Sequence, residues 1–467
     1  MKARIFILLL TLGLLSWWVA ACRPPVRGNG LNLLLITMET TRADHLGAYG
    51  YRRDTSPRLD ALAGQGALFE RAFSVSPRTN PSLASLMTSL YPHEHGVRSL
   101  LLPLEPENHT IAEILRNSGY VTGAVQTHPR LVASSGFDQG FDFYDDDFSD
   151  HPLAPQAATA AGDWIRDASG GDRPWFLWLH LMDPHWTYDP PEPWRTRYGP
   201  DDPRPALLYQ KLARRQITIG PMIFRNQMTR DEVDSFVNFY DAEIRFTDAA
   251  LGALLDLLEE LDLRRKTVVV VTSDHGESLG EHDYFFEHGD FGSDVEIHVP
   301  LILAAPDEVP AGIRVPGPVP SLDVAPTLLE LLGLPSAPRF RGISLLPLLD
   351  GSPGEDRVCF GETGTRFHEE NTLREVDGLA GKWRWIRRGS YKLIHIPVSE
   401  GPPERRLYDL STDPGEMVDV KERYPQILDE MGRLLDAWLS EDQGTIEREY
   451  HVTPELQEEL RSLGYMN

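Results

Sequence analysis

The sequence predicts an α/β protein with a large, mostly parallel sheet sandwiched by helices and a smaller C-terminal α+β domain. Short, nearly pure apolar runs are typical of strands buried on both faces. Amphipathic helical patterns lie between these runs, and the composition shifts after about residue 351. Strands that alternate with helices favour a parallel sheet covered on both faces, which binds ligands at the carboxyl ends of its strands.

Three runs carry the strand prediction, and they are Leu31–Thr37, Trp175–Met182 and Thr267–Thr272. Helices are predicted between and after them. In Tyr240–Leu261, leucines and isoleucines recur three to four residues apart and form one apolar stripe. Another helix is predicted to begin after Ser321 as N-cap and to end at Gly333-Leu334-Pro335.

The C-terminal part has a different pattern. Trp383–Ile396 alternates like an antiparallel strand pair with a turn at residues 388–390, and Glu416–Leu439 has a helical pattern. The sequence therefore predicts a catalytic domain over residues 31–375 and a smaller α+β domain over residues 376–467.

The N-terminus has the features of an export signal. Lys2 and Arg4 precede an apolar run from Ile5 to Ala21, which has the length of a signal peptide and is short for a membrane span. The run ends before Cys22 in a pattern that resembles a bacterial lipobox. We expect residues 1–21 to be a signal peptide, Cys22 to carry lipid, and residues 22–30 to form a tether. An uncleaved helical anchor is the alternative, and either one holds the protein at a membrane outside the cytoplasm.

The composition and net charge of the chain limit the kinds of molecule that it can bind. The chain has 467 residues with 41% apolar and 25% charged content, which is typical of globular proteins. A net charge of −25 argues against nucleic-acid binding. An anionic substrate must therefore be attracted locally, by a metal ion or a cluster of basic side chains. Apart from Cys22 the only cysteine is Cys359, so neither a disulfide framework nor a cysteine metal site is expected.

Polar residues follow each apolar run where the strand is expected to end. Glu39 follows the first run, His185 the second, and Asp274-His275 the third. Carboxylate oxygens and imidazole nitrogens together suit Zn²⁺ or Mn²⁺. Each residue alone is a weak signal, because a carboxylate at a strand end more often lies in a solvated turn. His180, inside the second run, is interpreted as a core histidine.

Several longer segments resemble the sulfatase family, in the order found in that family. They read LNLLLITMETTRADHLGAYGYRRDTSPRLDALAGQGALFERAFS, RTNPSLASLMTSLYPHEHGV, HLMDPHWTYDPP, YDAEIRFTDAALGALLDLLEELDL, VVVVTSDHGESLGEH, HVPLIL, SLDVAPTLLELLGLP and RGISLLPLLDG. The resemblance extends from Leu31 to about Leu439 and implies the fold of the alkaline phosphatase superfamily. It also implies a nucleophile in the segment Thr79-Asn80-Pro81-Ser82-Leu83.

This segment departs from the sulfatase pattern. Sulfatases carry Cys or Ser, oxidised to formylglycine, followed by x-Pro-x-Arg; here Thr79 cannot form the aldehyde, and Leu83 replaces the arginine. Glu39 stands where sulfatases have Asp, and the later sulfatase lysine is missing, with His288-Gly289 nearby.

The departures resemble phosphoethanolamine and phosphoglycerol transferases, which hold one metal with Glu, Thr, Asp and His. By this resemblance the ligands are Glu39, Thr79, Asp274 and His275, and Thr79 is the nucleophile. Zn²⁺ or Mn²⁺ is favoured, and Ca²⁺ or Mg²⁺ is possible.

Three further residues are expected to bind substrate. His185 and His288 are interpreted as imidazolium donors or ligands of a second metal, and Asn80 as a donor to the substrate.

The sequence predicts hydrolysis or transfer of a phosphoester or phosphodiester through a covalent Thr79 intermediate, because metal coordination activates a hydroxyl. The substrate is expected in the cell envelope or outside the cell. One alternative is a sulfuric ester hydrolase. Another, of a different class, is a non-catalytic descendant that binds anionic glycans or lipids.

Overall fold

The structure is a computed structural model that describes residues 28–147, 153–205, 207, 228–350, 354, 357–363, 382–398 and 401–442. The expected signal peptide, residues 1–21, and Cys22 lie outside these ranges. Within them, no helix has the length and apolar character needed to cross a membrane.

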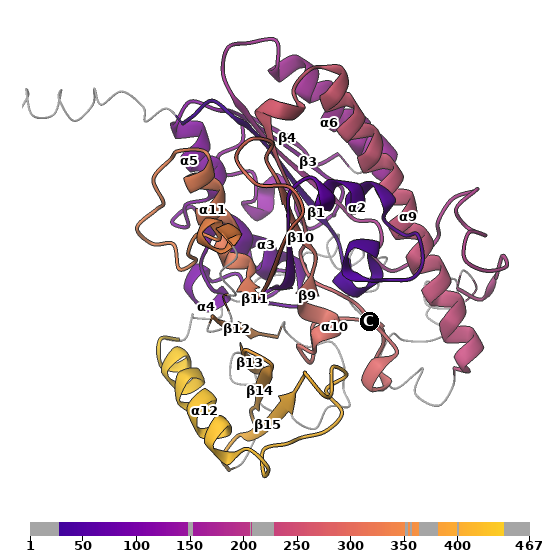
Figure 1. Cartoon of the computed structure of the whole chain (residues 1–467), viewed down its shortest axis with the longest axis vertical. Helices are drawn as coiled ribbons and strands as arrows, with labels where there is room; N and C mark the ends of the chain where they lie inside the picture. Colours follow the sequence, from indigo (N-terminus) through magenta and orange to yellow (C-terminus); the bar gives the residue numbers. More distant parts are fainter. Residues whose placement is uncertain are drawn as a thin grey trace, which may run out of the picture.

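A large sheet forms the centre of the molecule, and its strand order is β11-β2-β10-β6-β1-β5-β3-β4, with β9 paired to β2 (Figure 1). Its strands are β1 (Asn32–Met38), β2 (Ala67–Phe73), β3 (Val121–Gln126), β4 (Phe143–Asp145), β5 (Trp175–Leu181), β6 (Thr267–Ser273), β9 (His298–Val299), β10 (Leu301–Ala304) and β11 (Ile313–Pro320). Only β9 and β10 run antiparallel to their neighbours in this sheet as described. The prediction of a mostly parallel sheet is confirmed.

The three apolar runs of the sequence are the central strands β1, β5 and β6. The predicted bounds differ from the observed ones by one residue. β1 pairs in parallel with both others, so that Met38 is opposite Leu181 on one side and Ser273 on the other. The residues that follow these strands therefore emerge at one edge of the sheet.

Helices cover both faces of the sheet. On one face lie α2 (Pro57–Gly64), α6 (Ala154–Ala168) and α9 (Arg230–Glu260), and on the other lie α3 (Thr79–Thr88), α5 (Ile111–Asn117) and α11 (Val324–Leu331). A short helix, α4 (Pro92–His95), follows α3. The predicted helix at Tyr240 is the C-terminal part of α9, which begins ten residues earlier.

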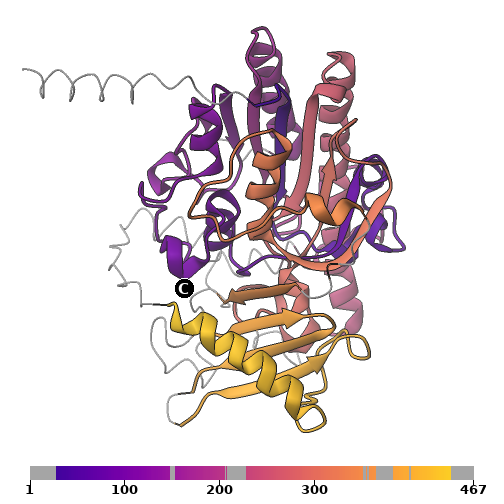
Figure 2. The ribbon, with the colours of Figure 1, turned by 60° about the vertical axis from the view of Figure 1, so that its left-hand side comes forward.

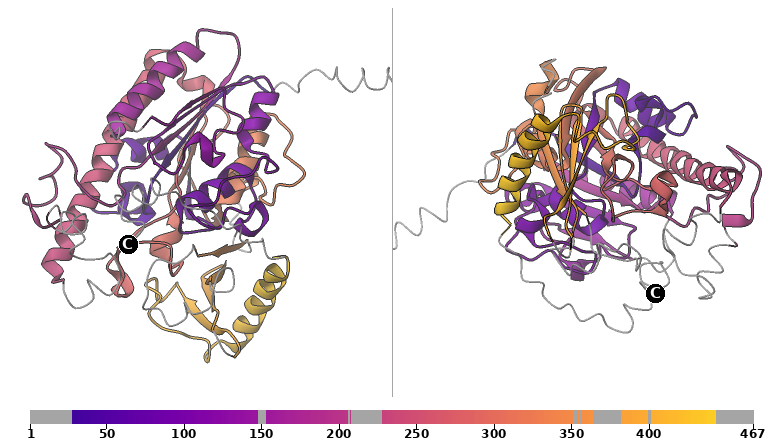
Figure 3. Two further views of the ribbon diagram at one scale, coloured as in Figure 1. Left: turned by 180° about the vertical axis from the view of Figure 1, so that it is seen from behind. Right: turned by 90° about the horizontal axis from the view of Figure 1, so that it is seen from below.

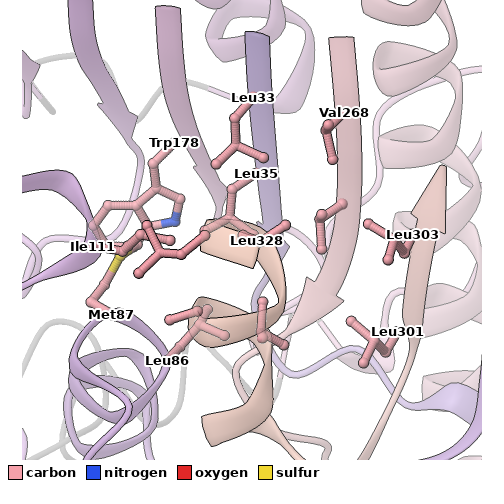
Figure 4. Close-up of a cluster of buried hydrophobic side chains, with 14 of the residues drawn as sticks. Leu33, Leu35, Leu86, Met87, Ile111, Trp178, Val268, Leu301, Leu303 and Leu328 are labelled. Carbon is pink, nitrogen blue, oxygen red and sulfur yellow. The ribbon is translucent and has the colours of Figure 1, made fainter. Parts of the chain in front are cut away.

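The core on the α3 side shows how the layers meet (Figure 4). Leu33 and Leu35 of β1 and Val268 of β6 point toward Leu86 of α3 and Leu328 of α11, and all are buried. Burial of such side chains stabilises the fold by about 1.5–3 kcal/mol each. This packing fixes α3, whose first residue is Thr79, against the sheet.

A second, antiparallel sheet lies beyond the carboxyl edge of the first (Figure 2). Its order is β12 (Val358–Glu362), β13 (Arg384–Arg388), β14 (Tyr391–Ile396) and β15 (Glu404–Asp409), and α12 (Pro425–Ser440) packs on its outer face. Its first strand precedes position 376, where the sequence placed the domain boundary. α12 begins later than the predicted Glu416, because Pro425 is suited to the first turn of a helix.

Two small elements follow β6 beyond its carboxyl end (Figure 3). The hairpin β7 (Ser278–Leu279) and β8 (Phe285–Glu287) follows β6, and the one-turn helix α10 (Asp294–Ile297) follows the hairpin. Both precede the antiparallel strand β10 in the chain.

Candidate metal centre and active site

The carboxyl edge of β1 and β6 is held together by backbone contacts with polar side chains. The Thr40 N–H donates to Oδ1 of Asp274 at 3.0 Å, and the Thr41 N–H donates to Oγ of Ser273 at 2.9 Å. The Glu39 N–H donates to the Leu181 carbonyl at 2.8 Å, which continues the pairing with β5. The chain after β1 therefore turns tightly over the end of β6, and Thr40 adopts a positive φ of 47° there.

The structure brings Glu39, Thr79, Asp274 and His275 together. Oγ1 of Thr79 donates a hydrogen bond to Oε1 of Glu39 at 2.5 Å and lies 3.4 Å from Nε2 of His275. The same Nε2 lies 3.0 Å from Oδ2 of Asp274 and 3.7 Å from Oε1 of Glu39. All four residues are buried. The ligand atoms of Glu39, Asp274 and His275 lie within 4.8 Å of one another, close enough to share one ion.

The electrostatics of this group fit a divalent cation. Burial and the charge of Asp274 raise the pKa of Glu39 well above its usual range. Burial also acts on Asp274, but the charge of His275 outweighs it and lowers the pKa of Asp274. Among the described residues, every ion pair of Glu39 and Asp274 is with a histidine. Two buried carboxylates without a permanently charged partner suit a metal ion.

His180 is a residue whose connection to this group the sequence did not reveal. It is buried and both ring nitrogens are hydrogen-bonded, as expected of a core histidine. One partner is Oγ1 of Thr37 at 2.8 Å, but the other is Oε2 of Glu39 at 2.8 Å. Because β5 pairs with β1 in register, His180 is opposite Thr37 and reaches the end of β1. It orients a candidate metal ligand.

Three more histidine rings form a row that begins beside His275. His288 lies 4.2 Å from His275 between ring centroids, His185 lies 5.5 Å from His288, and His128 lies 6.4 Å from His185. Burial lowers the pKa of His185 to about 4, which favours the neutral ring. Its role toward a substrate or a second metal stays a prediction. One group of three candidate metal-binding side chains is found in the described ranges, and it consists of Glu39, Asp274 and His275.

His288 is held by a carboxylate that the sequence analysis left unassigned. Its Nδ1 lies 2.9 Å from Oε1 of Glu277, whose other oxygen accepts a hydrogen bond from the Tyr188 hydroxyl at 3.1 Å. Nε2 of His288 is buried and has no hydrogen-bond partner among the described residues. Its contact with a substrate stays a prediction.

Asn80 follows Thr79 in α3, and its amide group is engaged elsewhere. The Asn80 Nδ2 donates to the carbonyl oxygens of Leu100 at 3.2 Å and Arg130 at 3.5 Å. Its Oδ1 is buried and has no hydrogen-bond partner within the described part of the chain. These bonds fix the side chain, and its role toward a substrate stays a prediction.

Arg78 immediately precedes Thr79, and the sequence analysis did not single it out. It is 2% exposed, and its side chain crosses Gly289, where an added Cβ would collide with Nε of Arg78. Burial lowers the pKa of His288, and the charges of His275 and Arg78 lower it further. Arg78 thus supplies positive charge close to the nucleophile segment.

Comparison with known proteins agrees with this geometry. The sequence profile described as Sulfatase matches residues 31–334, which is more than half of the chain. The chain belongs to the sulfatase family. A second profile, described as N-sulphoglucosamine sulphohydrolase, C-terminal, matches residues 280–440. The chain is therefore a hydrolase of the alkaline phosphatase superfamily, as the resemblance implied.

Individual relatives of this sulfatase-family chain are distant. Arylsulfatase K of Mus musculus is 27% identical over 414 residues, which cover 79% of this chain and 72% of the relative. The N-acetylglucosamine-6-O-sulfatase of Bacteroides thetaiotaomicron is 24% identical and covers 93% of this chain and 91% of its own length. The phosphonate monoester hydrolase of Agrobacterium radiobacter superposes with a TM-score of 0.71 at 23% identity, over 91% of this chain and 98% of that one.

These comparisons favour the sulfuric ester hydrolase, which was the alternative, over a phosphoester or phosphodiester transferase. The matched profiles and curated relatives carry sulfatase names. At 23% identity, the likeness to the phosphonate hydrolase shows the fold alone.

Proposed function

We propose that this chain hydrolyses a sulfate ester, with Thr79 as nucleophile and Glu39, Thr79, Asp274 and His275 as the ligands of one divalent cation. The family match supports the substrate class. The observation that carries the mechanism is the place of the Thr79 hydroxyl, 2.5 Å from Glu39 and 3.4 Å from His275. A divalent cation bound there acts as a Lewis acid and lowers the pKa of a coordinated hydroxyl.

The residues of this chain account for the other requirements of ester cleavage. Oε1 of Glu39 accepts the Thr79 proton, which leaves the hydroxyl oxygen able to attack. The attack forms a bond from the Thr79 oxygen to sulfur and breaks the bond from sulfur to the leaving oxygen. His288, hydrogen-bonded to Glu277, is placed to protonate the leaving alcohol. Water then attacks the sulfur and gives up a proton to His288, the bond from sulfur to the Thr79 oxygen breaks, and Glu39 returns its proton to that oxygen.

Carbohydrate sulfates are the substrates to test first. One relative is named for a sulfate on N-acetylglucosamine, and the matched C-terminal profile is named for an N-sulphoglucosamine hydrolase. We propose a sulfated saccharide outside the cytoplasm. The basis for that location is the N-terminal segment that ends at Cys22.

A phosphorus ester is the second candidate, and the threonine itself favours it. A formylglycine can expel sulfate by collapse of a hemiacetal, whereas a threonine sulfate requires attack by water. A threonine phosphate is resolved by water or by an acceptor alcohol. Thr79 therefore suits phosphoryl chemistry as well as, or better than, sulfuryl chemistry.

A panel of chromogenic esters separates the candidates. Purified enzyme is assayed with an aryl sulfate, a phosphonate monoester, a phosphodiester and a phosphomonoester, with Thr79→Ala as control. We expect the aryl sulfate to have the highest kcat/KM. Preference for a phosphorus ester would establish the second candidate. Turnover of none, with no stoichiometric metal bound, would leave the non-catalytic binder.

The membrane anchor has its own test. We propose that Cys22 carries lipid and holds the enzyme at the cell envelope. Detergent-phase partitioning compares the full chain with Cys22→Ser; the variant should move to the aqueous phase, and equal partitioning would contradict lipidation at this residue.

A further inference from the structure

The one-turn helix α10 lies between the two sheets (Figure 1). It contacts the loop that contains His275 and the loop that contains His288. The carbonyl oxygen of Glu296 accepts a hydrogen bond from the Gly276 N–H at 2.7 Å. Oε1 of the same residue accepts one from the Gly289 N–H at 2.7 Å. Each glycine directly follows a site histidine, His275 or His288. The buried residue Glu296 thus fixes the backbone at the residues that follow both histidines.

The first residue of α10 is bound by the C-terminal sheet. Oδ1 of Asp294 accepts a hydrogen bond from Nζ of Lys392 at 2.9 Å, and Oδ2 pairs with Arg387. The Asp294 N–H donates to Oε1 of Glu416 at 3.2 Å, and Lys392 also donates to that oxygen at 2.6 Å. Lys392 and Glu416 are buried, so solvent screens this cluster little.

Steric contacts leave α10 little room to shift. A Cβ at Gly276 would collide with the carbonyl oxygen of Val295 in α10. A Cβ at Gly292, just before the helix, would lie 2.9 Å from Cδ1 of Trp385 in β13. The Ser74 N–H, after β2, donates to the Ile297 carbonyl at 2.9 Å. A displacement of Asp294 is therefore expected to reach the site loops, because close-packed contacts transmit it.

We propose that the C-terminal sheet is a positioning element of the active site, in which Lys392 and Arg387 hold Asp294 and, through Glu296, fix the places of His275 and His288. This inference goes beyond the proposed function because it concerns how the site is held, whichever ester is cleaved. Residues that orient metal ligands from behind can change metal affinity or activity by roughly 10- to 100-fold.

Lys392→Met tests the proposal, because it removes the ammonium group and keeps much of the apolar stem. We expect faster amide hydrogen exchange in peptides that contain Gly276 and Gly289, by roughly tenfold. We also expect zinc affinity, measured by titration of the metal-free protein, to fall by roughly 10-fold or more, and kcat to fall more than KM rises. Lys392→Arg should restore part of each.

Leu435→Ala is the matched control. Leu435 is a buried residue of α12 and packs with Ile386 and Leu393 on the face of the C-terminal sheet that is turned away from α10. It should lower Tm without changing exchange at Gly276 or Gly289, zinc affinity or kcat. Equal behaviour of the two variants at similar Tm would overturn the proposal, because the sheet would then act through global stability alone.

If Lys392→Met does not fold, Asp294→Asn is a second variant that tests the same proposal. Asp294→Asn preserves size and weakens both ion pairs, and it should give the same changes in exchange and zinc affinity. Unchanged values in a folded Asp294→Asn protein would also overturn the proposal. Hydrogen exchange needs no substrate, so failure of the proposed sulfate hydrolysis stays distinguishable from failure of this inference.

Discussion

Nδ1 of His288 lies 2.9 Å from Oε1 of Glu277. The two residues flank the β7–β8 hairpin, which follows Asp274 and His275 in the chain. Burial raises the pKa of Glu277 well above its usual range and lowers that of His288. The proton of this hydrogen bond can therefore reside on either partner. With it on Nδ1, the Nε2 of neutral His288 is an acceptor. When Nε2 takes up a second proton, Nδ1 can pass its own to Glu277, and Nε2 then carries hydrogen and donates.

Glu277→Gln is expected to impair this exchange while preserving shape. The amide can donate to Nδ1 but cannot take up its proton, so Nε2 is held as a donor. We expect kcat to fall by about 10²–10⁴-fold, the usual range for loss of acid–base catalysis, with a smaller change in KM. Tyr188→Phe removes only the bond to the other carboxyl oxygen and should cost less. Equal kcat in wild type and Glu277→Gln would exclude the pair from the reaction.

Thr79 variants test the covalent step directly. Brief exposure to substrate, followed by intact-mass analysis, should show an added sulfate or phosphate on the wild-type chain. Thr79→Ala should show none and lose nearly all turnover, whereas Thr79→Ser keeps a hydroxyl and should retain measurable activity. A mass gain that persists in Thr79→Ala would place the nucleophile elsewhere.

Removal of metal should destabilise the fold as well as stop turnover. A cation held by Glu39, Asp274 and His275 would bind only when the strand ends are assembled, so it would stabilise the folded state. At a free metal concentration of about 100 Kd the stabilisation is about 2.7 kcal/mol. Chelation should therefore lower Tm in calorimetry, and Zn²⁺ or Mn²⁺ should restore it more effectively than Mg²⁺. An unchanged Tm, with no metal found by elemental analysis, would contradict the site.

Acid should weaken the contact between Glu362 of the C-terminal sheet and Arg98, which follows α4. Burial alone would raise its pKa, but the charges of Arg98 and Arg384 outweigh burial and lower the pKa from 4.5 to about 2. Because the folded pKa lies below the ordinary value, the stabilisation is present above pH 4.5 and is lost as the pH falls toward 2.

Thermal unfolding from pH 7 to 3 measures this contribution. Glu362→Gln should have a lower Tm at pH 7, and the difference should shrink below about pH 4.5. Glu430→Gln is the control, since the pair of Glu430 with Arg388 is largely exposed and contributes little. A difference that is constant with pH would mean that the Glu362 charge does not contribute.

The central sheet could be predicted because β1, β5 and β6 are buried on both faces and read as unbroken apolar runs. β3 escaped this pattern because it contains polar residues and Gly123, where an added Cβ would collide with Trp164 of α6. Without β3 there was no strand end from which to predict His128. The parallel pairing of β3 with β5, which the sequence does not reveal, places His128 near the site.

The grouping of the candidate metal ligands could be predicted for a similar reason. Glu39 and Asp274 follow two identifiable strands, and family resemblance supplied Thr79. Glu277 and Arg78 depend instead on contacts between distant segments. The β7–β8 hairpin brings Glu277 to His288, and a close crossing brings Arg78 to Gly289. Neither contact leaves a periodic pattern in the sequence.

Gly289 restricts how related sequences can diverge at this site. Its φ of +102° disfavours other residues, and Arg78 fills the space that a side chain would occupy. We expect the two positions to covary among homologues, so that arginine at 78 is accompanied by glycine at 289. A shorter residue at 78 would relax the steric part of this restriction and open position 289 to residues that tolerate a left-handed backbone, such as asparagine.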